Sequence, residues 1–179
     1  IPLAPLHQPH NLAAADAIAQ WRSRMPQVAC FDTAFHRSQP SVAQTFGLPR
    51  SMTDAGIIRY GFHGLSYDYI AQVLPDHLPA DKANRRVIVA HLGNCASMCA
   101  MNHRHSVATT MGFTALHGFI MGRRCGTLEA GIVLHLIQQI GMKPADIQKM
   151  LYRESGLLGV SGISNSMQEL ILSTNPHAK

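Results

Sequence analysis

Charged residues make up only 14% of this 179-residue chain, and aromatic residues only 6%. Hydrophobic residues reach 46%, so the chain can build a core and lacks the composition of disordered proteins. No apolar run approaches the roughly 18 residues that a membrane-spanning helix needs. The first residues also lack the charged and apolar regions of a secretory signal, so we expect neither membrane insertion nor export.

Cysteines are few, and no two of them have the CxxC spacing of structural zinc sites. Without a secretory signal, a disulfide framework is not expected either. His103 and His105 would share one side of a strand and form the strongest pair for a metal, but surface histidines beside a turn are the favoured interpretation. We therefore predict no metal ligands here and expect a reducing, cytoplasmic location.

Basic residues exceed acidic ones, 15 against 10, and give a net charge of +5. They are scattered, with only short pairs such as Arg85-Arg86 and Arg123-Arg124. A surface that follows a nucleic-acid backbone would show a denser stripe with interleaved aromatic residues. The pattern favours local anion sites and argues against a nucleic-acid partner.

The first third of the chain predicts a helix and then a buried strand. Residues 1–10 are proline-rich and extended, and Asn11 is a suitable cap for a helix that runs to about Arg24. The sequence QVACFDTAF, from Gln27 to Phe35, is typical of a buried strand that Asp32 interrupts. A carboxylate there is costly to bury unless it is paired or functional, and both alternatives remain open.

Two glycines flank Phe62-His63 and allow a ligand or backbone to approach closely. Ser66 is a candidate cap for a following helix, Tyr67 to Leu74. A single histidine is more often a core residue than a catalyst, but the flanking glycines favour a functional role for His63.

Three successive strands are predicted at 86–92, 96–101 and 106–110, joined by short turns into an antiparallel sheet. The first turn carries Gly93 and Asn94, whose backbone N–H groups and amide can hold an oxyanion. No GxxxxGK[ST] loop and no GxGxxG motif after a strand occur in the chain.

Beyond residue 110, the segment MGRRCG places Arg124 in a loop between glycines. The planar guanidinium fork suits phosphate or carboxylate, although a surface arginine in a flexible loop is an equal alternative. Helices are predicted from Glu129 to Ile140, ended by Gly141, and from Pro144 to Arg153.

Five segments occur in an order that resembles the acetate and propionate kinase family: FDTAFH (31–36), YGFHG (60–64), HLGN (91–94), MGFT (111–114) and SGLLGVSGIS (155–164). PLAPLHQPHN near the start is similar to the substrate loop of that family. The resemblance covers nearly the whole chain. It implies an α/β fold of the ribonuclease-H-like, two-lobed sugar-kinase, Hsp70 and actin type, with a ligand cleft between the lobes.

The resemblance also implies the reaction. Members of the family transfer the γ-phosphoryl group of ATP, with Mg²⁺, reversibly to a short carboxylate, giving an acyl phosphate such as acetyl phosphate. By position, Asp32 matches the catalytic aspartate of the family, His63 a histidine that stabilises the transferring phosphoryl group, and Arg124 an arginine that binds carboxylate or phosphoryl oxygens.

Further positions match the binding sites of the family. The phosphate-binding hairpin corresponds to the nucleotide-binding residues His91, Leu92, Gly93, Asn94 and Cys95. His7 matches another active-site histidine, and Leu6 and Phe62 resemble residues that line a small pocket for the acyl methyl group. One methylene changes discrimination by only about 1–3 kcal/mol, so acetate, propionate and butyrate all remain open.

The chain departs from the family at several of these positions. Cys95 replaces a glycine of the hairpin, which is expected to alter the nucleotide site. Ala115 replaces a pocket proline and is expected to loosen acyl packing. Arg123 adds positive charge beside Arg124, and Tyr67 stands where many members have a second histidine.

Other segments of the family have no counterpart here, including the serine-rich phosphate strand, the adenosine loop and the metal-binding glutamate. We therefore expect a central part of a longer kinase, with residues 1–36 ending the amino-terminal lobe and 37–179 linking to and beginning the carboxy-terminal lobe. Little activity is expected of the chain alone, most metal ligands are expected outside it, and the complete enzyme is expected to be a homodimer. A non-catalytic remnant that retains an anion pocket is the alternative.

Overall fold

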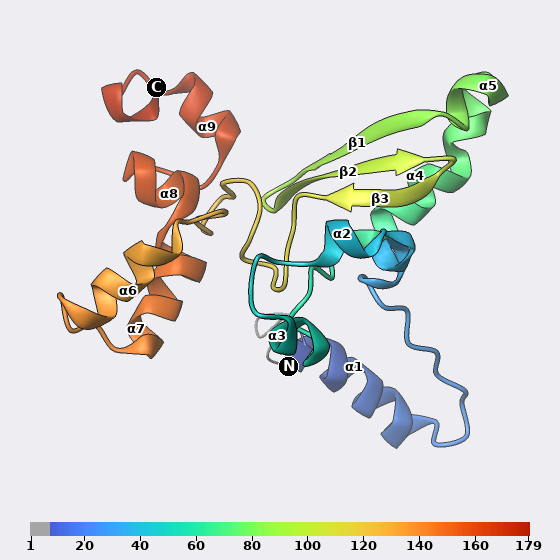
Figure 1. Ribbon diagram of the computed structural model, residues 1–179, viewed down its shortest axis with the longest axis horizontal. Helices are drawn as coiled ribbons and strands as arrows, with labels where there is room; N and C mark the ends of the chain where they lie inside the picture. Colours follow the sequence, from blue (N-terminus) through green and yellow to red (C-terminus); the bar gives the residue numbers. More distant parts are fainter. Residues whose placement is uncertain (1–7) are drawn as a thin grey trace.

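The computed structural model describes residues 8–179, and a three-stranded antiparallel sheet lies at its centre (Figure 1). The strands are β1 (Arg86–Leu92), β2 (Ala96–Asn102) and β3 (His105–Thr109), paired in the order β1-β2-β3. Leu92 pairs with Ala96 and Asn102 with His105, so both connections are tight turns. The three predicted strands are confirmed, each to within one residue at either end.

One face of the sheet is covered by helix α4 (Gly64–His77). Along β2, alternate residues are buried, which places Ser97, Cys99 and Met101 on the same side of the strand. Cys99 and Met101 pack with Tyr67 and Ala71 of α4 in a fully buried cluster. This cluster fixes the helix against the strands.

Helix α4 begins earlier than its sequence predicts. Ser66 was the expected cap, but the structure has the helix starting at Gly64, with His63 as the preceding residue at a positive φ of 61°. The cap prediction is wrong because the first turn finds its hydrogen-bond acceptors elsewhere, on Asp32. The helix itself is confirmed.

The amino-terminal segment forms helix α1 (Gln8–Trp21), so the predicted helix is present and ends three residues before Arg24. The cap prediction is wrong, because Asn11 lies inside the helix. The strand predicted from Gln27 to Phe35 is wrong: residues 26–31 have no regular structure, and Ala34–Ser38 forms a 3₁₀ helix, η1. A strand needs a hydrogen-bonded neighbour, and within residues 8–179 no strand lies beside this segment. Val28 is accordingly 86% exposed.

Short helices make up the segments between these elements. They are α2 (Ser41–Gln44) and α3 (Arg50–Asp54) before α4, and α5 (Ala80–Ala83) before β1. A bridge between Thr45 and Ile58 closes the segment from 37 to 60 on itself, and contacts of η1 and α2 with β3 join it to the edge of the sheet. The long segment before α4 is therefore packed against β3.

The remaining helices gather beyond the turn that joins β1 to β2 (Figure 1). They are α6 (Ala130–Gln138), α7 (Pro144–Lys149), the π-helix η2 (Met150–Glu154), α8 (Gly156–Ser161), α9 (Met167–Leu172) and the 3₁₀ helix η3 (Pro176–Ala178). Glu129 caps α6 by accepting from the N–H of Gly131, and Gly141 follows its end with a φ of 74°. Both predicted helices are confirmed.

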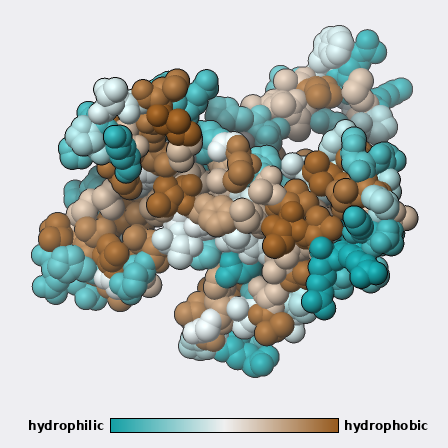
Figure 2. Space-filling model, turned by 90° about the horizontal axis from the view of Figure 1, so that it is seen from above, coloured by the Kyte–Doolittle hydropathy of each residue, from teal (hydrophilic) through white to brown (hydrophobic). Residues whose placement is uncertain are grey.

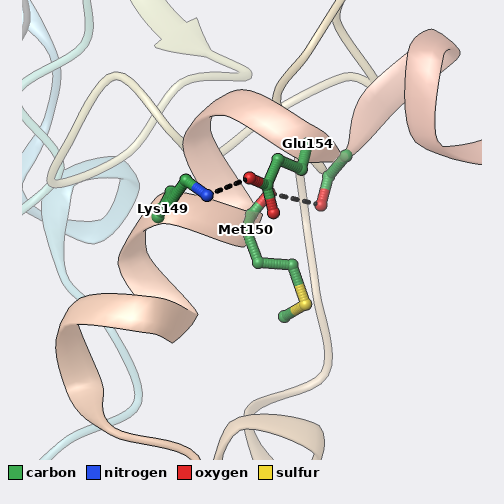
Figure 3. A network of polar contacts seen from close by, with 4 residues as sticks. Lys149, Met150 and Glu154 are labelled. Carbon is green, nitrogen blue, oxygen red and sulfur yellow. Dashed lines mark hydrogen bonds and ion pairs between the residues drawn. The ribbon is translucent and has the colours of Figure 1, made fainter.

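The π-helix η2 continues α7 and carries an ion pair (Figure 3). Lys149 Nζ lies 2.7 Å from Glu154 Oε1, a spacing of five residues that suits the wider turn of a π-helix. Both side chains are about half exposed or more, so this pair contributes little to stability. Among residues 8–179, no helix combines the length and hydrophobicity needed to cross a membrane.

Candidate functional site

His63 occupies the junction between the sheet and the start of α4. Its Nδ1 lies 2.7 Å from the hydroxyl of Ser97 on β2. Its ring stacks on the ring of His91, the sixth residue of β1, with centroids 4.1 Å apart and planes 16° from parallel. His91 Nδ1 in turn lies 3.2 Å from the hydroxyl of Ser66. Two predicted site residues, 28 positions apart in the sequence, are thus in direct contact.

The surroundings of His63 keep its ring neutral. The pKa of His63 is lowered to about 4, mainly by partial burial and next by the neighbouring ring of His91. Arg124 and His36 act in the same direction, while the carboxylate of Asp32 opposes them. At neutral pH, His63 therefore has one N–H and one free lone pair, and can donate or accept at its exposed ring edge.

Asp32 reaches the same place from the segment before η1. Its carboxylate accepts from the backbone N–H of His63 at 2.6 Å and of Leu65 at 3.3 Å, and its carbonyl accepts from Gly64 N–H at 2.9 Å. These are the unpaired N–H groups of the first turn of α4. The sequence left open whether Asp32 is structural or functional. The structure shows a structural role, because the carboxylate caps the start of a helix 31 residues further along the chain.

His36 links the backbone beside His63 to β3 through two hydrogen bonds. The sequence did not predict this structural role. The buried ring of His36 lies 3.0 Å from the carbonyl of Phe62 through Nε2 and 2.9 Å from the hydroxyl of Ser106 through Nδ1. Because a carbonyl can only accept, Nε2 carries the proton and Nδ1 accepts from Ser106. Burial lowers the pKa of His36, so this neutral tautomer persists at neutral pH.

Phe62 lies in a small buried cluster with Met111, Ala115 and Met121. The side chain of Cys95 packs against this cluster. The sequence predicts that Cys95 alters the nucleotide site. In the structure, its side chain packs against these apolar neighbours. The cluster forms a small apolar core directly beside His63 in the sequence.

Arg124 is buried, and its Nη1 donates to the carbonyl of Ala115 at 2.9 Å. The arginine is therefore held to the Phe62 cluster and is not a mobile surface side chain. It lines a hollow of about 330 Å³, and none of the lining residues is acidic: Asn94, Arg123, Arg124, Tyr152 and Arg153. Three guanidinium groups around one hollow favour an anionic ligand.

Asn94 is fixed in the hairpin turn by residues from the carboxy-terminal segment. Its Oδ1 accepts from Asn165 Nδ2 at 3.1 Å, and its carbonyl accepts from Gly122 N–H at 3.0 Å. A Cβ on Gly122 would lie 2.0 Å from Asn94 Oδ1, so a larger residue there would displace the Asn94 side chain. The side-chain NH₂ of Asn94 still has a proton to donate toward an anion.

Not every predicted site residue joins this group. Leu6 and His7 lie outside the described residues. Leu92 is largely exposed at the end of β1, and Gly93 lies at the tip of the turn. His103 lies in the turn between β2 and β3 with a φ of 49°, as the alternative to a metal site predicted.

Magnesium is usually held by one or two carboxylates together with substrate phosphates. Within residues 8–179, no three His, Cys, Asp or Glu side chains come close enough to hold a metal ion. The carboxylate of Asp32 is already occupied by two N–H groups. The part of the chain that the structure describes does not by itself form a site for this cation.

The sequence did not predict that Ser97 and Tyr67 contact each other and that Ser97 contacts His63. Both are fully buried, and their hydroxyls hydrogen-bond to each other while Ser97 also contacts His63. The signal for Ser97 was its register on β2, because a serine that alternates with Cys99 and Met101 must lie on the buried face and find a partner there. For Tyr67 no local signal existed.

Comparison with known proteins identifies the family of this chain. A sequence profile of the acetokinase family matches residues 1–179. The chain belongs to the acetokinase family. It is 58% identical over 176 residues to an acetate kinase of Rhodopseudomonas palustris and 55% identical over 170 residues to one of Methylocella silvestris. These matches cover 98% and 95% of the chain, but only 44% and 42% of the two relatives.

Solved structures of acetate and propionate kinases have the same fold as this chain. A Porphyromonas gingivalis acetate kinase superposes with a TM-score of 0.86 at 35% identity, and a Francisella tularensis propionate kinase with 0.88 at 34%. Each match covers 97% of this chain and 45% or 46% of the solved one. The expected family and the α/β fold of the sugar-kinase, Hsp70 and actin type are confirmed. The chain spans less than half the length of the relatives that it matches.

Proposed function

We propose that the protein transfers the γ-phosphoryl group of ATP reversibly to acetate or a similar short carboxylate, giving ADP and an acyl phosphate. The observation that carries the proposal is that Arg124 lines one hollow with Asn94 and is hydrogen-bonded to Ala115 of the apolar Phe62 cluster, while its charge also lowers the pKa of His63. Charged and polar donors next to a small apolar surface suit a substrate with a carboxylate at one end and a methyl group at the other.

In the reaction, a carboxylate oxygen forms a bond to the γ-phosphorus while the bond from that phosphorus to the β–γ bridging oxygen breaks. Such a transfer needs alignment and charge neutralisation more than covalent help. The buried guanidinium of Arg124, pre-positioned by Ala115, supplies fixed positive charge. No proton has to move, so a neutral His63 contributes as a hydrogen-bond donor to a phosphoryl oxygen.

The hairpin turn and the arginine hollow make up the nucleotide side of the proposal. The backbone N–H groups of Asn94 and Cys95 and the side-chain amide of Asn94 are donors for phosphate oxygens, while the N–H of Gly93 donates to the carbonyl of Cys95 within the turn. Arg123 and Arg153 add charge around the same hollow. Magnesium would neutralise phosphate charge when bound, and no step is assigned to it here.

Formation of acyl hydroxamate from acetate, ATP and hydroxylamine tests the proposal in the protein at its full natural length. Arg124→Ala should lower kcat/KM about 100-fold or more, because it removes a charge aimed at the developing phosphoryl charge. The control is Arg86→Ala, at the far end of β1, which should leave activity unchanged. Equal activity of the Arg124→Ala variant and the wild type would disprove the assigned role.

A non-catalytic, anion-binding protein is the second candidate. The hollow with three arginines favours it, since phosphate binding there needs no complete active site. Calorimetry with ATP and acetyl phosphate, combined with the hydroxamate assay, separates the two candidates. Binding without any turnover at full length would support the second one.

Acyl specificity forms a further part of the proposal. The Francisella tularensis structure is of a propionate kinase, and the apolar cluster here includes the small residue Ala115. Because Ala115 is smaller than the proline of the family, we expect acetate and propionate both to be accepted, with kcat/KM values that differ by about 10- to 200-fold at most. A cytoplasmic location, a homodimer and a lobe boundary near residue 36 complete the proposal, and cell fractionation, light scattering and limited proteolysis test them in turn.

A further inference from the structure

Tyr67, Ser97 and His63 form a chain of hydrogen bonds that leads from the core to the candidate site. Tyr67 lies on α4 and Ser97 on β2, and neither is accessible to solvent. The Tyr67 hydroxyl contacts Ser97 Oγ, which lies 2.7 Å from His63 Nδ1. The three groups are held in place by the cluster of Tyr67, Ala71, Cys99 and Met101.

The direction of these hydrogen bonds follows from counting partners. Among the residues that the structure describes, the Tyr67 hydroxyl has Ser97 as its side-chain partner and a backbone hydrogen bond with His91. The contact with His91 acts against the rise that burial causes in the pKa of Tyr67, so there the His91 N–H donates and the phenol oxygen accepts. A buried hydroxyl proton needs an acceptor, so Tyr67 donates to Ser97 Oγ. The proton of Ser97 cannot then point back at Tyr67, and the remaining acceptor is Nδ1 of His63.

This direction leaves His63 Nδ1 without a proton. A neutral imidazole has one N–H, which must then be on Nε2. Within residues 8–179, Nε2 of His63 forms no hydrogen bond. The proton is therefore available to a ligand.

We infer that Tyr67 is a positioning residue that acts through Ser97 to hold His63 as the Nε2–H tautomer, a neutral donor aimed at the transferring phosphoryl group. The inference rests on the proposed function for its ligand. The hydrogen-bond chain itself does not depend on that function.

Two further observations agree with a neutral relay. Burial raises the pKa of Tyr67, so the phenol keeps the proton that it donates. Stacking on His91 at 4.1 Å fixes the plane of the His63 ring, so the tautomer decides which group points outward. The charged or titratable groups that act on His63 are Asp32, His36, His91 and Arg124, and of these only Asp32 favours the charged ring.

Tyr67→Phe tests the inference because it removes one oxygen and keeps the ring that packs in the core. Tyr69→Phe is the matched control, since Tyr69 lies on the same helix and is 63% exposed. Both variants are made in the protein at its full natural length. The ring nitrogens of ¹⁵N-labelled histidine are then observed by NMR at neutral pH, and acyl-phosphate formation is measured in parallel.

The wild type and Tyr69→Phe should show His63 with its proton on Nε2. In Tyr67→Phe, Ser97 is free to accept from Nδ1–H, so the Nδ1–H tautomer should rise to a comparable population. The kcat should fall roughly 10- to 100-fold, as for other groups that orient a site residue through a hydrogen bond. The KM for acetate should change about twofold at most, because the lost interaction belongs to the transition state.

Two results would overturn the inference. One is a wild-type His63 with its proton on Nδ1, and the other is a Tyr67→Phe variant that matches Tyr69→Phe in both NMR and kcat. Ser97→Ala is a second variant, in which the population of the Nδ1–H tautomer of His63 must also rise. A wild type without any acyl-phosphate formation would instead refute the proposed function. The NMR result would still show whether the hydrogen bonds from Tyr67 through Ser97 set the tautomer of His63.

Discussion

At the level of single residues, Asp32 joins the segment before η1 to the first turn of α4. It accepts two backbone N–H groups through its carboxylate and a third through its carbonyl. The catalytic role implied by family resemblance and this capping role are compatible, because the cap fixes the backbone of His63. Loss of Asp32 should therefore affect both stability and activity.

Asp32→Ala should lower the free energy of unfolding by about 1–2 kcal/mol, the usual cost of losing a side-chain cap. Asp68→Ala on the exposed side of α4 is the control, and it should cost about 0.5 kcal/mol or less. Urea denaturation of the full-length protein measures both. Equal losses for the two variants would contradict the capping role.

The stability of the protein should fall as the pH drops from about 6.5 to about 4. The folded-state pKa of His63 is lowered to about 4, so the unfolded chain binds its proton first and acid favours unfolding in this window. His36, whose pKa is also lowered, acts with the same sign. His63→Asn, which tolerates the positive φ, should make urea midpoints less dependent on pH between these values. An unchanged dependence would argue against a neutral His63.

At the level of elements, the first residue of α4, Gly64, lies so close to the backbone of Asp32 that no side chain fits there. A Cβ there would lie 2.0 Å from the carbonyl oxygen of Asp32. Because that neighbour is backbone, the helix start would have to move away.

Gly64→Ala should therefore cost more than about 3 kcal/mol of stability, well above an ordinary surface substitution. Gly47→Ala is the matched control, since no atom lies within 4 Å of a Cβ at that position. Thermal or urea unfolding compares the two. A Gly64→Ala variant as stable as Gly47→Ala would show that the contact with Asp32 is not required.

The elements also show how far the sequence predicts the fold. The sheet followed from one β-branched strand, Arg86–Leu92, and from the short turns after it, which are local signals, and all three strands were found. The strand expected from Gln27 to Phe35 was wrong because pairing depends on a neighbour, which apolar composition alone does not reveal. The early start of α4 was missed because its cap comes from Asp32, 32 residues before Gly64.

The candidate site was predictable to a similar degree. The family motifs indicated His63, His91 and Arg124, and the structure brings these residues together. The relay through Ser97 and Tyr67 joins residues 30 positions apart, and no pattern in either segment announces that contact. Tertiary contacts between distant segments are what a single sequence conveys least.

At the level of the whole molecule, large apolar side chains are exposed on several elements (Figure 2). They include Ile88 and Leu92 on β1, and Ile171 and Leu172 on α9, each more than 70% exposed. Exposed apolar surface of this extent is typical of faces that other protein segments cover. The chain also spans only 44% of its Rhodopseudomonas palustris relative.

The 179-residue chain by itself should accordingly bind the dye ANS and self-associate at micromolar concentration. Replacing Ile171 with Lys and Leu172 with Glu should lower both signals, because it removes two of the most exposed apolar side chains. Gln168→Lys on the same helix is the control for added charge. Fluorescence and light scattering report the outcome, and a monomer that binds no dye would contradict the prediction.

The central claim, that these residues belong to a site for phosphoryl transfer to a carboxylate, is tested most directly with ¹⁸O-labelled acetate. The full-length protein is incubated with ATP and [¹⁸O₂]acetate, and the product is examined by ³¹P NMR. Attack by the carboxylate predicts acetyl phosphate with one ¹⁸O bonded to phosphorus, formed by the wild type and greatly reduced in Arg124→Ala. Acetyl phosphate whose phosphorus carries only ¹⁶O, or no acyl phosphate at all from acetate, propionate or butyrate, would contradict the claim.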